Sequence, residues 1–160
     1  MAFLLARRRD LLLVLAIAGV VVAGYLSWVA LDDEQQVVCS GVGDCQTVQS
    51  SEYAEIAGVP IAVLGLGMYL ALVALIAARR WWGALRDGEE PPQALAGLTF
   101  ALAFGGTLYS AYLTWLELFE IEAICVWCVG SAVIVTLLML LSAPDLRAAS
   151  REIEADAGPS

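Results

Sequence analysis

The chain has 160 residues, of which 61% are hydrophobic and only 16% are charged, and its formal net charge is −9. A soluble domain of this length would carry more charge and fewer apolar residues. The apolar excess lies in long runs, which indicates a membrane protein. Because no basic patch is interleaved with aromatic residues, the sequence argues against nucleic-acid binding.

The first apolar run covers residues 11–31 and follows a basic N-terminal segment, residues 1–10. About 20 residues of helix cross a hydrocarbon core of ~30 Å. The run is longer than the ~7–15 apolar residues of a signal peptide, and acidic residues follow it without a small-residue cleavage site. We therefore predict a transmembrane helix here.

A polar loop, residues 32–58, follows this helix and contains Cys39 and Cys45 on either side of a glycine-rich turn. Its second half, from Thr47 to Ala57, favours a short half-helix, because two apolar residues eight positions apart would share one face. The loop is therefore expected to combine a cysteine pair with a half-helix.

Three further apolar runs predict membrane spans at about residues 59–78, 94–115 and 124–141. Pro60 would lie in the first turn of the second span, where a missing N–H costs little. The polar tail, residues 143–160, is predicted to be disordered. The expected fold is an all-α membrane protein: a four-transmembrane-helix bundle, residues 11–142, with a cysteine loop and a short half-helix outside the membrane.

The charged residues predict the orientation of this bundle. All eight basic residues are arginines, and they lie in the N-terminal segment, the link between the second and third spans, and the tail. The two other connections carry only acidic charges, including the turn with Glu117, Glu120 and Glu122. By the positive-inside rule both termini lie in the cytoplasm, and all four cysteines lie outside it, where disulfides persist.

Cys125 and Cys128 form a C-x-x-C motif at the start of the fourth span. Their sulfurs can bond directly, and Cys128 would lie about a turn deeper, nearer to anything dissolved in the lipid. The helix N-terminus favours a thiolate whereas burial in lipid disfavours it, and the sequence leaves the outcome open. Together with Cys39 and Cys45, which can close a second disulfide, the motif indicates a thiol-disulfide relay.

Two other roles for these cysteines remain open at this point. They could be static disulfides, although a bond within a helical C-x-x-C closes too small a loop to add much stability. They could also bind zinc, which would require all four thiolates or help from carboxylates, because the chain contains no histidine. We expect no metal.

Five motifs occur in a fixed order over about residues 10–142: Cys39-x5-Cys45, Val48-x2-Ser51-x-Tyr53-Ala54, Gly58-x-Pro60, Gly65-x3-Tyr69 and Cys125-x2-Cys128. In this combination the chain resembles the bacterial form of the vitamin K epoxide reductase (VKOR) family. The resemblance implies a thiol:quinone oxidoreductase of the bacterial cytoplasmic membrane. Its four helices would enclose ubiquinone or menaquinone near the outer face, with the half-helix as a cap.

The resemblance also implies a role for each cysteine. Cys39 would exchange with a separate thioredoxin-like periplasmic protein. Cys45 would pass electrons to Cys125, and Cys128 would face the quinone. Ser51 matches the family's serine or threonine near the quinone head, although without the motif its hydroxyl would be expected to bond backbone.

Aromatic residues of the spans are further candidates for contact with a quinone. Those predicted to bind it are Tyr69, Tyr112 and Trp127, although aromatic residues are common at membrane interfaces anyway. The glycines of the second and third spans are expected to allow close helix packing instead: Gly65, Gly67, Gly105 and Gly106.

Two departures from the family pattern shape the expected activity. Ile61 and Ala132 stand where the vertebrate enzymes use an asparagine and a tyrosine to hold vitamin K, so we expect a plain quinone acceptor and no epoxide reduction. Many bacterial relatives carry a fused thioredoxin-like domain after a fifth span, whereas here we expect a separate partner protein.

Three alternative functions remain. The disulfide-bond formation protein B type places its C-x-x-C in the first outer loop, the reverse of the order in this chain. A bundle with static disulfides would scaffold a membrane complex. The third is a reductase, either a vitamin K-type quinone reductase that runs on thiols or one fed by the quinone pool that runs the relay in the opposite direction.

Overall fold

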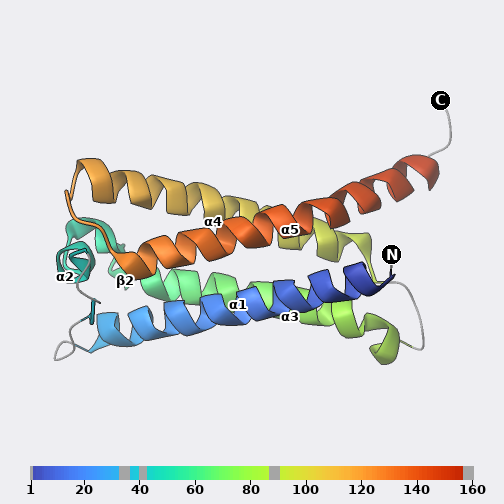
Figure 1. Cartoon of the computed structure of the whole chain (residues 1–160), viewed down its shortest axis with the longest axis horizontal. Coiled ribbons are helices and arrows are strands. Elements are labelled where there is room, and N and C mark those ends of the chain that lie inside the picture. The colour runs from blue at the N-terminus through green and yellow to red at the C-terminus, as the bar shows by residue number, and fades with distance from the viewer. Residues whose placement is uncertain (1, 33–36, 40–42, 87–90, 157–160) are drawn as a thin grey trace.

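The computed structural model describes residues 2–32, 37–39, 43–86 and 91–156. In chain order its elements are α1 (Ala2–Leu31), α2 (Cys45–Gln49), the 3-10 helix η1 (Glu52–Ala54), β1 (Glu55–Ile56), β2 (Val59–Pro60), α3 (Ile61–Leu85), α4 (Gln93–Phe119) and α5 (Val126–Asp156). Within the described residues, 4 helices are long and apolar enough to cross a membrane: α1, α3, α4 and α5 (Figure 1). The predicted fold class is confirmed.

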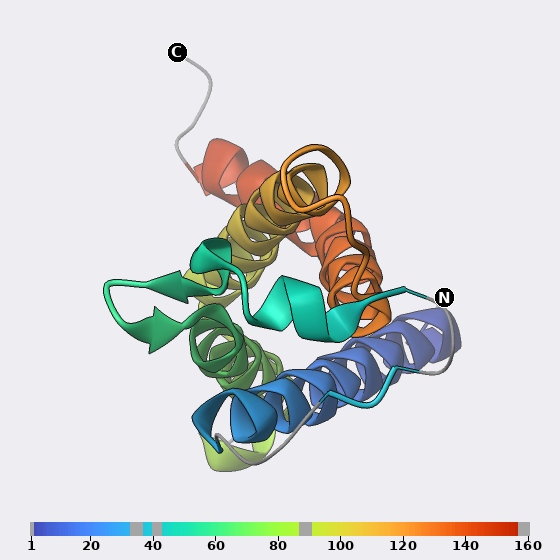
Figure 2. The same ribbon diagram turned by 90° about the vertical axis from the view of Figure 1, so that its left-hand side faces the viewer.

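The four long helices are arranged as a closed ring of neighbours. Both α1 and α4 pack against α3 and α5. Seen from the end, α2 lies across one end of this bundle (Figure 2). The N-terminus and the C-terminal end of α5 lie at the other end (Figure 1). The cysteine loop therefore lies at the same end of the bundle as the start of α5.

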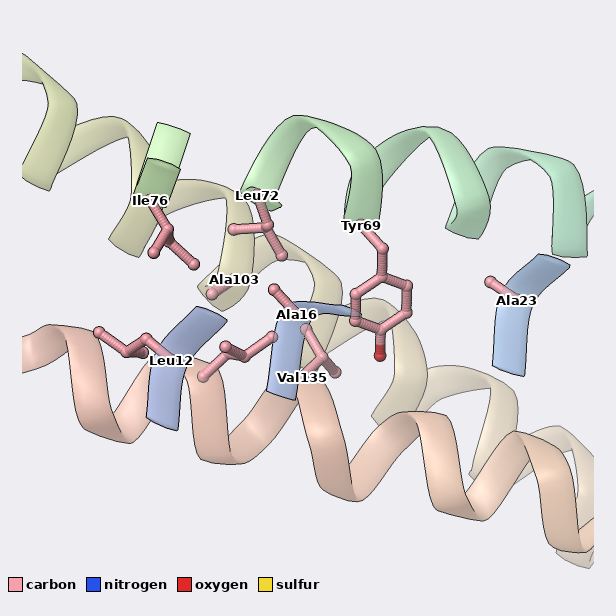
Figure 3. Packing of buried hydrophobic residues seen from close by; sticks show 9 residues of the cluster. Leu12, Ala16, Ala23, Tyr69, Leu72, Ile76, Ala103 and Val135 are labelled. Carbon is pink, nitrogen blue, oxygen red and sulfur yellow. The ribbon is translucent and has the colours of Figure 1, made fainter. Parts of the chain in front are cut away.

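The centre of the bundle is a cluster of apolar side chains from all four long helices (Figure 3). Its buried members are Leu12, Ala16, Ala23, Tyr69, Leu72, Ile76, Ala103, Val135 and Leu138. Gly19 lets α1 approach α3, because a Cβ at this position would collide with the Tyr69 ring. Since lipid tails are as apolar as leucine, van der Waals packing rather than removal from water stabilises these contacts.

The segment after α2 differs from the half-helix predicted for residues 47–57. The chain leaves α2 at Gln49, makes η1, and then turns back as a short antiparallel hairpin. The register pairs Glu55 with Pro60 and Ile56 with Val59. Ala57 and Gly58 connect the strands with φ of 52° and 79°, and a right-handed helix cannot pass through such left-handed residues. Pro60 consequently precedes α3 and does not lie in its first turn.

The prediction of a disordered tail at residues 143–160 is wrong for most of its length, because α5 continues to Asp156. Pro144 lies inside this helix and removes one backbone hydrogen bond. The residues after it are mostly alanine, leucine, arginine and glutamate, which are strong helix formers. The carboxylate of Asp145 also pairs with Arg8 of α1 and, at 2.7 Å, with Arg79 of α3, and these ion pairs hold the extension against the bundle.

Candidate functional site

The four cysteines lie together at the end of the bundle that α2 covers. Cys39 and Cys45 form a disulfide, with their Cα atoms 6.0 Å apart. Cys125 and Cys128 are free thiols. Cys45 and Cys125 are buried in one apolar cluster, and Cys39 and Cys128 pack against it. The structure thus brings an oxidised pair and a reduced pair into one cluster.

Backbone hydrogen bonds hold the loop disulfide against the C-x-x-C segment. The N–H of Asp44 donates to the carbonyl oxygen of Ile124 at 3.0 Å. Gly43 has φ of 89°, and a Cβ added there would collide with the same carbonyl oxygen. The indole N–H of Trp127 donates to the carbonyl oxygen of Val38 at 2.9 Å. Neighbours of both loop cysteines are therefore bonded to neighbours of the C-x-x-C cysteines.

Helix α2 presents Cys45 to this contact. Its N-cap is Asp44, which accepts from the Thr47 N–H at 3.1 Å and from the Thr47 hydroxyl at 2.6 Å. The hydroxyl bond, followed by the backbone bond, lowers the pKa of the Asp44 carboxyl below its ordinary value. Cys45 and Val48 are the buried residues of the helix. The capped turn therefore fixes Cys45 on the inner face.

Cys125 immediately precedes α5, which begins at Val126 rather than at residue 124. Hydrogen bonding from the Cys128 thiol lowers the pKa of Cys125 to about 7, and the backbone N–H groups of Cys128 and Trp127 act in the same direction. Burial and the nearby charge of Glu117 oppose this shift. For Cys125, hydrogen bonding, above all from the Cys128 thiol, therefore outweighs burial and favours the thiolate.

A cavity of about 450 Å³ lies beside the C-x-x-C motif. This volume falls within the ~300–1,000 Å³ that is usual for small-molecule sites. Its walls come mainly from α3 and α4, with contributions from α1, α2, η1 and α5. Most lining residues are apolar, and the polar or thiol side chains among them are Gln49, Ser51, Tyr53, Tyr69, Tyr109, Ser110, Thr114, Glu117, Cys128 and Ser131. The motif's second cysteine thus borders a largely apolar cavity.

Of the residues predicted to contact a quinone, Ser51, Tyr69 and Cys128 line the cavity. The Ser51 hydroxyl donates to the Val48 carbonyl oxygen at 2.8 Å, which is the backbone bond expected without the family motif. The Tyr69 hydroxyl donates to the carbonyl oxygen of Ser131, also at 2.8 Å. Both hydroxyls are therefore already hydrogen-bonded within the protein.

The other two predicted contacts, Tyr112 and Trp127, do not line this cavity. Trp127 packs on Tyr25 of α1, with ring centroids 5.1 Å apart. Tyr112 is 51% exposed on the outside of α4, where its ring neighbours Tyr109 at 6.2 Å. The sequence placed these rings at the correct end of the bundle but could not say which face of their helix points inward.

The glycines also divide between two roles that the sequence did not separate. Gly106 allows close packing, because a Cβ there would come within 2.9 Å of Val135. Gly106 also lines the cavity, as do Gly65 and Gly105, and a Cβ at either of the latter two positions would meet nothing within 4 Å. Gly67 has the same open surroundings but does not line the cavity. Close packing is therefore confirmed for Gly106 alone among these four.

Sequence reasoning missed two polar residues of the cavity, Gln49 and Glu117. The Gln49 amide nitrogen lies 3.9 Å from the Cys128 sulfur. Glu117 was assigned to an acidic turn, but it belongs to the last turns of α4 and is only 3% exposed. A carboxyl flanked by leucines near the end of an apolar span is the signal that could have identified it.

Among the described residues, no group of 3 or more histidine, cysteine, aspartate or glutamate side chains is arranged to hold a metal ion.

Comparison with known proteins agrees with this geometry. The family model described as the vitamin K epoxide reductase family matches residues 11–143, which include all four cysteines. The thiol-disulfide oxidoreductase LTO1 of Arabidopsis thaliana is 30% identical over 127 residues, covering 77% of this chain and 32% of that protein. The chain therefore spans about a third of the length of this relative. Since the family model matches most of its length, the chain belongs to the vitamin K epoxide reductase family.

Proposed function

We propose that this chain is a membrane thiol:quinone oxidoreductase that reoxidises a thioredoxin-like protein and so supports disulfide formation outside the cytoplasm. The observation that carries the proposal is the contact between the loop disulfide and the free thiol pair, which itself borders an apolar cavity. Family membership and the similarity to a thiol-disulfide oxidoreductase support the same chemistry.

The first exchange takes place in the loop. A thiolate of the reduced partner attacks Cys39, the Cys39–Cys45 bond breaks, and Cys45 leaves as a thiolate. The partner's second thiol then displaces Cys39, so the partner gains a disulfide and the loop becomes a dithiol. Cys39 suits the first attack because it is more exposed than Cys45, which is only 1% exposed.

The second exchange carries two electrons inward. The Cys45 thiolate attacks Cys125 in the Cys125–Cys128 disulfide, and Cys128 leaves as a thiolate. Cys39 then attacks Cys45, which reforms the loop disulfide and releases Cys125 as a thiolate. The shared burial of Cys45 and Cys125 and the lowered pKa of Cys125 favour this step, because a low pKa makes Cys125 a good leaving group.

The cavity suits a quinone as the final acceptor. Its apolar walls match a lipid-soluble ring, and Ile61 adds apolar surface at a position where the vertebrate enzymes have a polar one. The Gln49 amide and the Tyr109 hydroxyl would donate to the ring oxygens, and Ser51 would do so after its hydroxyl turns away from the Val48 carbonyl oxygen. A bound quinone accepts two electrons and two protons and leaves as quinol. Cys125 and Cys128 lose the same number of each as their disulfide reforms.

The distribution of charge supports the proposed orientation. Arg8, Arg79 and Arg80 form ion pairs near the end of the bundle opposite the cysteine cluster. With this end in the cytoplasm, as the positive-inside rule requires, the cysteines face the oxidising side of a bacterial cytoplasmic membrane.

Trapping tests the relay. In Cys128→Ala the Cys125 thiolate attacks Cys45 of the loop disulfide. Because Cys128 is missing, no second thiol of the C-x-x-C motif can displace Cys125 from the new bond, so a Cys45–Cys125 disulfide should accumulate. In Cys45→Ala the Cys39 thiolate can attack the disulfide of the oxidised thioredoxin-like partner, and with no Cys45 to displace the partner this should leave Cys39 in a mixed disulfide with it. Peptide mapping under non-reducing conditions identifies both bonds. If neither bond forms while both variants insert normally, the relay is refuted and static disulfides become the better explanation.

A matched pair of glycine variants tests the cavity. Gly65→Leu should fill the cavity without a backbone clash and abolish quinone reduction, whereas Gly67→Leu adds the same side chain outside it. Exchange between the two cysteine pairs should survive in both variants. Equal quinone reduction by the two variants would show that this cavity is not the quinone site.

A further inference from the structure

Glu117 is the residue of this site that neither the relay nor the family motifs use. It lies near the end of α4, where the chain turns sharply back into α5. The N–H of Ala123 donates to the Glu117 carbonyl oxygen at 3.0 Å, and the N–H of Ile121 donates to the Leu116 carbonyl oxygen at 2.9 Å. These bonds close the turn and bring the start of α5 against the Glu117 side chain.

The Glu117 carboxyl is buried without a cationic partner. The residue is 3% exposed, and it takes no part in the ion pairs that Arg8, Arg79 and Arg80 make within the described part of the chain. A buried charge without such a partner is costly unless hydrogen bonds compensate. The N–H of Cys125 donates to Glu117 Oε2 at 2.9 Å, and the N-terminus of α5 favours a negative charge. Burial therefore favours the neutral carboxyl, whereas the hydrogen bond and the helix N-terminus favour the carboxylate.

The same carboxyl connects the thiols with the cavity. It interacts with the Cys128 thiol as well as with the backbone of Cys125, and it lines the cavity together with Cys128. The other titratable groups that line the cavity are the tyrosines Tyr53, Tyr69 and Tyr109, and no arginine or aspartate lies among its described lining residues. Glu117 is thus the one carboxyl in the described lining that touches both the thiol pair and the cavity.

We propose that Glu117 is the proton acceptor of the Cys125–Cys128 pair and carries protons from these thiols into the cavity. This inference rests on the proposed quinone-linked function and assigns a route for its protons. A purely structural role, in which Glu117 only caps the start of α5, would use the hydrogen bond to Cys125 and leave the contact with Cys128 unused.

The proton balance is as follows. The Glu117 carboxylate accepts the proton of the Cys128 thiol, which becomes a thiolate. The resulting carboxylic acid gives this proton to a quinone oxygen as electrons arrive there, and becomes a carboxylate again. The proton of Cys125 follows the same route through the adjoining Cys128 sulfur. When the Cys125–Cys128 bond has formed, two electrons and two protons have left the pair, and Glu117 is unchanged.

Glu117→Gln separates proton transfer from helix capping. The amide oxygen of glutamine can still accept from the Cys125 N–H, but the side chain cannot take up a proton. Glu120→Gln is the matched control, because it removes an exposed carboxyl one turn further along the chain. Glu117→Asp keeps a titratable group at the position and should recover part of any lost rate, which guards against a misfolded glutamine variant.

The first measurement needs no quinone. In the fully reduced protein, thiolate ultraviolet absorbance and the rate of alkylation are followed against pH. Removing the Glu117 charge should shift the midpoint of alkylation of the Cys125–Cys128 pair to lower pH by about one unit, which raises the rate at about pH 6 roughly fivefold, because a like charge disfavours a neighbouring thiolate. Glu120→Gln should match the wild type.

The second measurement is a single turnover of quinone reduction by the reduced protein in lipid nanodiscs. Glu117→Gln should be slower by ~100-fold, the low end of what a general base contributes, and should lose the pH dependence of the wild type. The proposal is supported only if the thiol titration changes and quinone reduction slows in the same variant. Slower reduction with an unchanged titration would indicate positioning alone, and an unchanged rate would exclude Glu117 from the proton route. Either result overturns the proposal.

Failure of the proposed function gives a different pattern. If the wild type itself does not reduce quinone while the thiol titration responds to Glu117→Gln, the quinone acceptor is refuted and proton exchange between Glu117 and the thiols is supported.

Discussion

Replacing Gly43 with alanine should separate the two cysteine pairs without changing any cysteine. Gly43 has φ of 89°, and it lies where the loop meets the carbonyl oxygen of Ile124. A methyl group at this position both strains the backbone and collides with that oxygen, which is the acceptor of the 3.0 Å hydrogen bond from Asp44. The loop should therefore withdraw from the start of α5.

The size of the effect follows from these contacts. A non-glycine residue in a left-handed conformation costs of the order of 1–3 kcal/mol. Loss of the Asp44 hydrogen bond adds about 0.5–1.5 kcal/mol. Together they destabilise the docked loop by roughly 1.5–4.5 kcal/mol, and since 1.4 kcal/mol corresponds to a factor of ten, exchange between the pairs should slow by about 10- to 2,000-fold.

The assay starts from protein that carries one disulfide in the loop and two free thiols at the C-x-x-C motif. Rapid alkylation at successive times, followed by peptide mapping, gives the rate at which the disulfide moves between the pairs. Gly58→Ala is the control, because its φ is 79° but a Cβ there meets nothing within 4 Å. It bears the backbone strain in the hairpin and leaves the loop contact intact.

If the disulfide moves between the pairs as fast in Gly43→Ala as in the wild type, the reasoning is refuted, because the contact with Ile124 then does not govern transfer between the pairs. Equal slowing in Gly43→Ala and Gly58→Ala would also refute it, since general strain in the outer segment would then explain the effect.

Three further predictions concern stability. The pKa of Cys125 is lowered from 9.0 to about 7, so its thiolate stabilises the reduced fold fully above pH 9.0, and this contribution is lost as the pH falls through about 7. The difference in Tm between the reduced protein and Cys125→Ser should therefore increase as the pH rises from about 7 to 9.0. Asp44→Ala should destabilise α2 because it removes the N-cap, which should be seen as faster proteolysis of the loop. The contribution of the Asp44 cap is present above pH 3.8 and is lost as the pH falls through the lower folded pKa. Asp145→Asn should lower the Tm in detergent by the equivalent of ~3–5 kcal/mol, because it breaks buried ion pairs. Asp10→Asn breaks only the more exposed pair with Arg80 and should cost less than about 1 kcal/mol.

The sequence by itself determined the features that depend on local pattern. Apolar runs long enough to cross a bilayer predicted the four membrane helices, because a spanning segment must satisfy its own backbone hydrogen bonds. The arginines predicted the orientation, which stays a prediction. The spacing of Cys125 and Cys128, and of Cys39 and Cys45, predicted two pairs that can each form a disulfide.

Features that depend on contacts between distant parts of the chain could not be predicted in this way. The polar composition of residues 143–160 predicts disorder. In the structure Asp145 pairs with arginines of α1 and α3, and these ion pairs hold this part of α5 against the bundle. The half-helix at residues 47–57 gave way to a hairpin because Ala57 and Gly58 are left-handed, and local propensity does not reveal that conformation at an alanine.

The candidate site shows the same division. The sequence predicted which cysteines can pair by their spacing, but only the tertiary structure decided that Cys45 and Cys125 share one buried cluster. It also decided that Glu117, assigned from sequence to an acidic turn, touches the thiols and the cavity instead. The physical reason is that pairing within a motif follows from spacing along the chain, whereas the surroundings of a buried carboxyl are set by how four helices and one loop pack together.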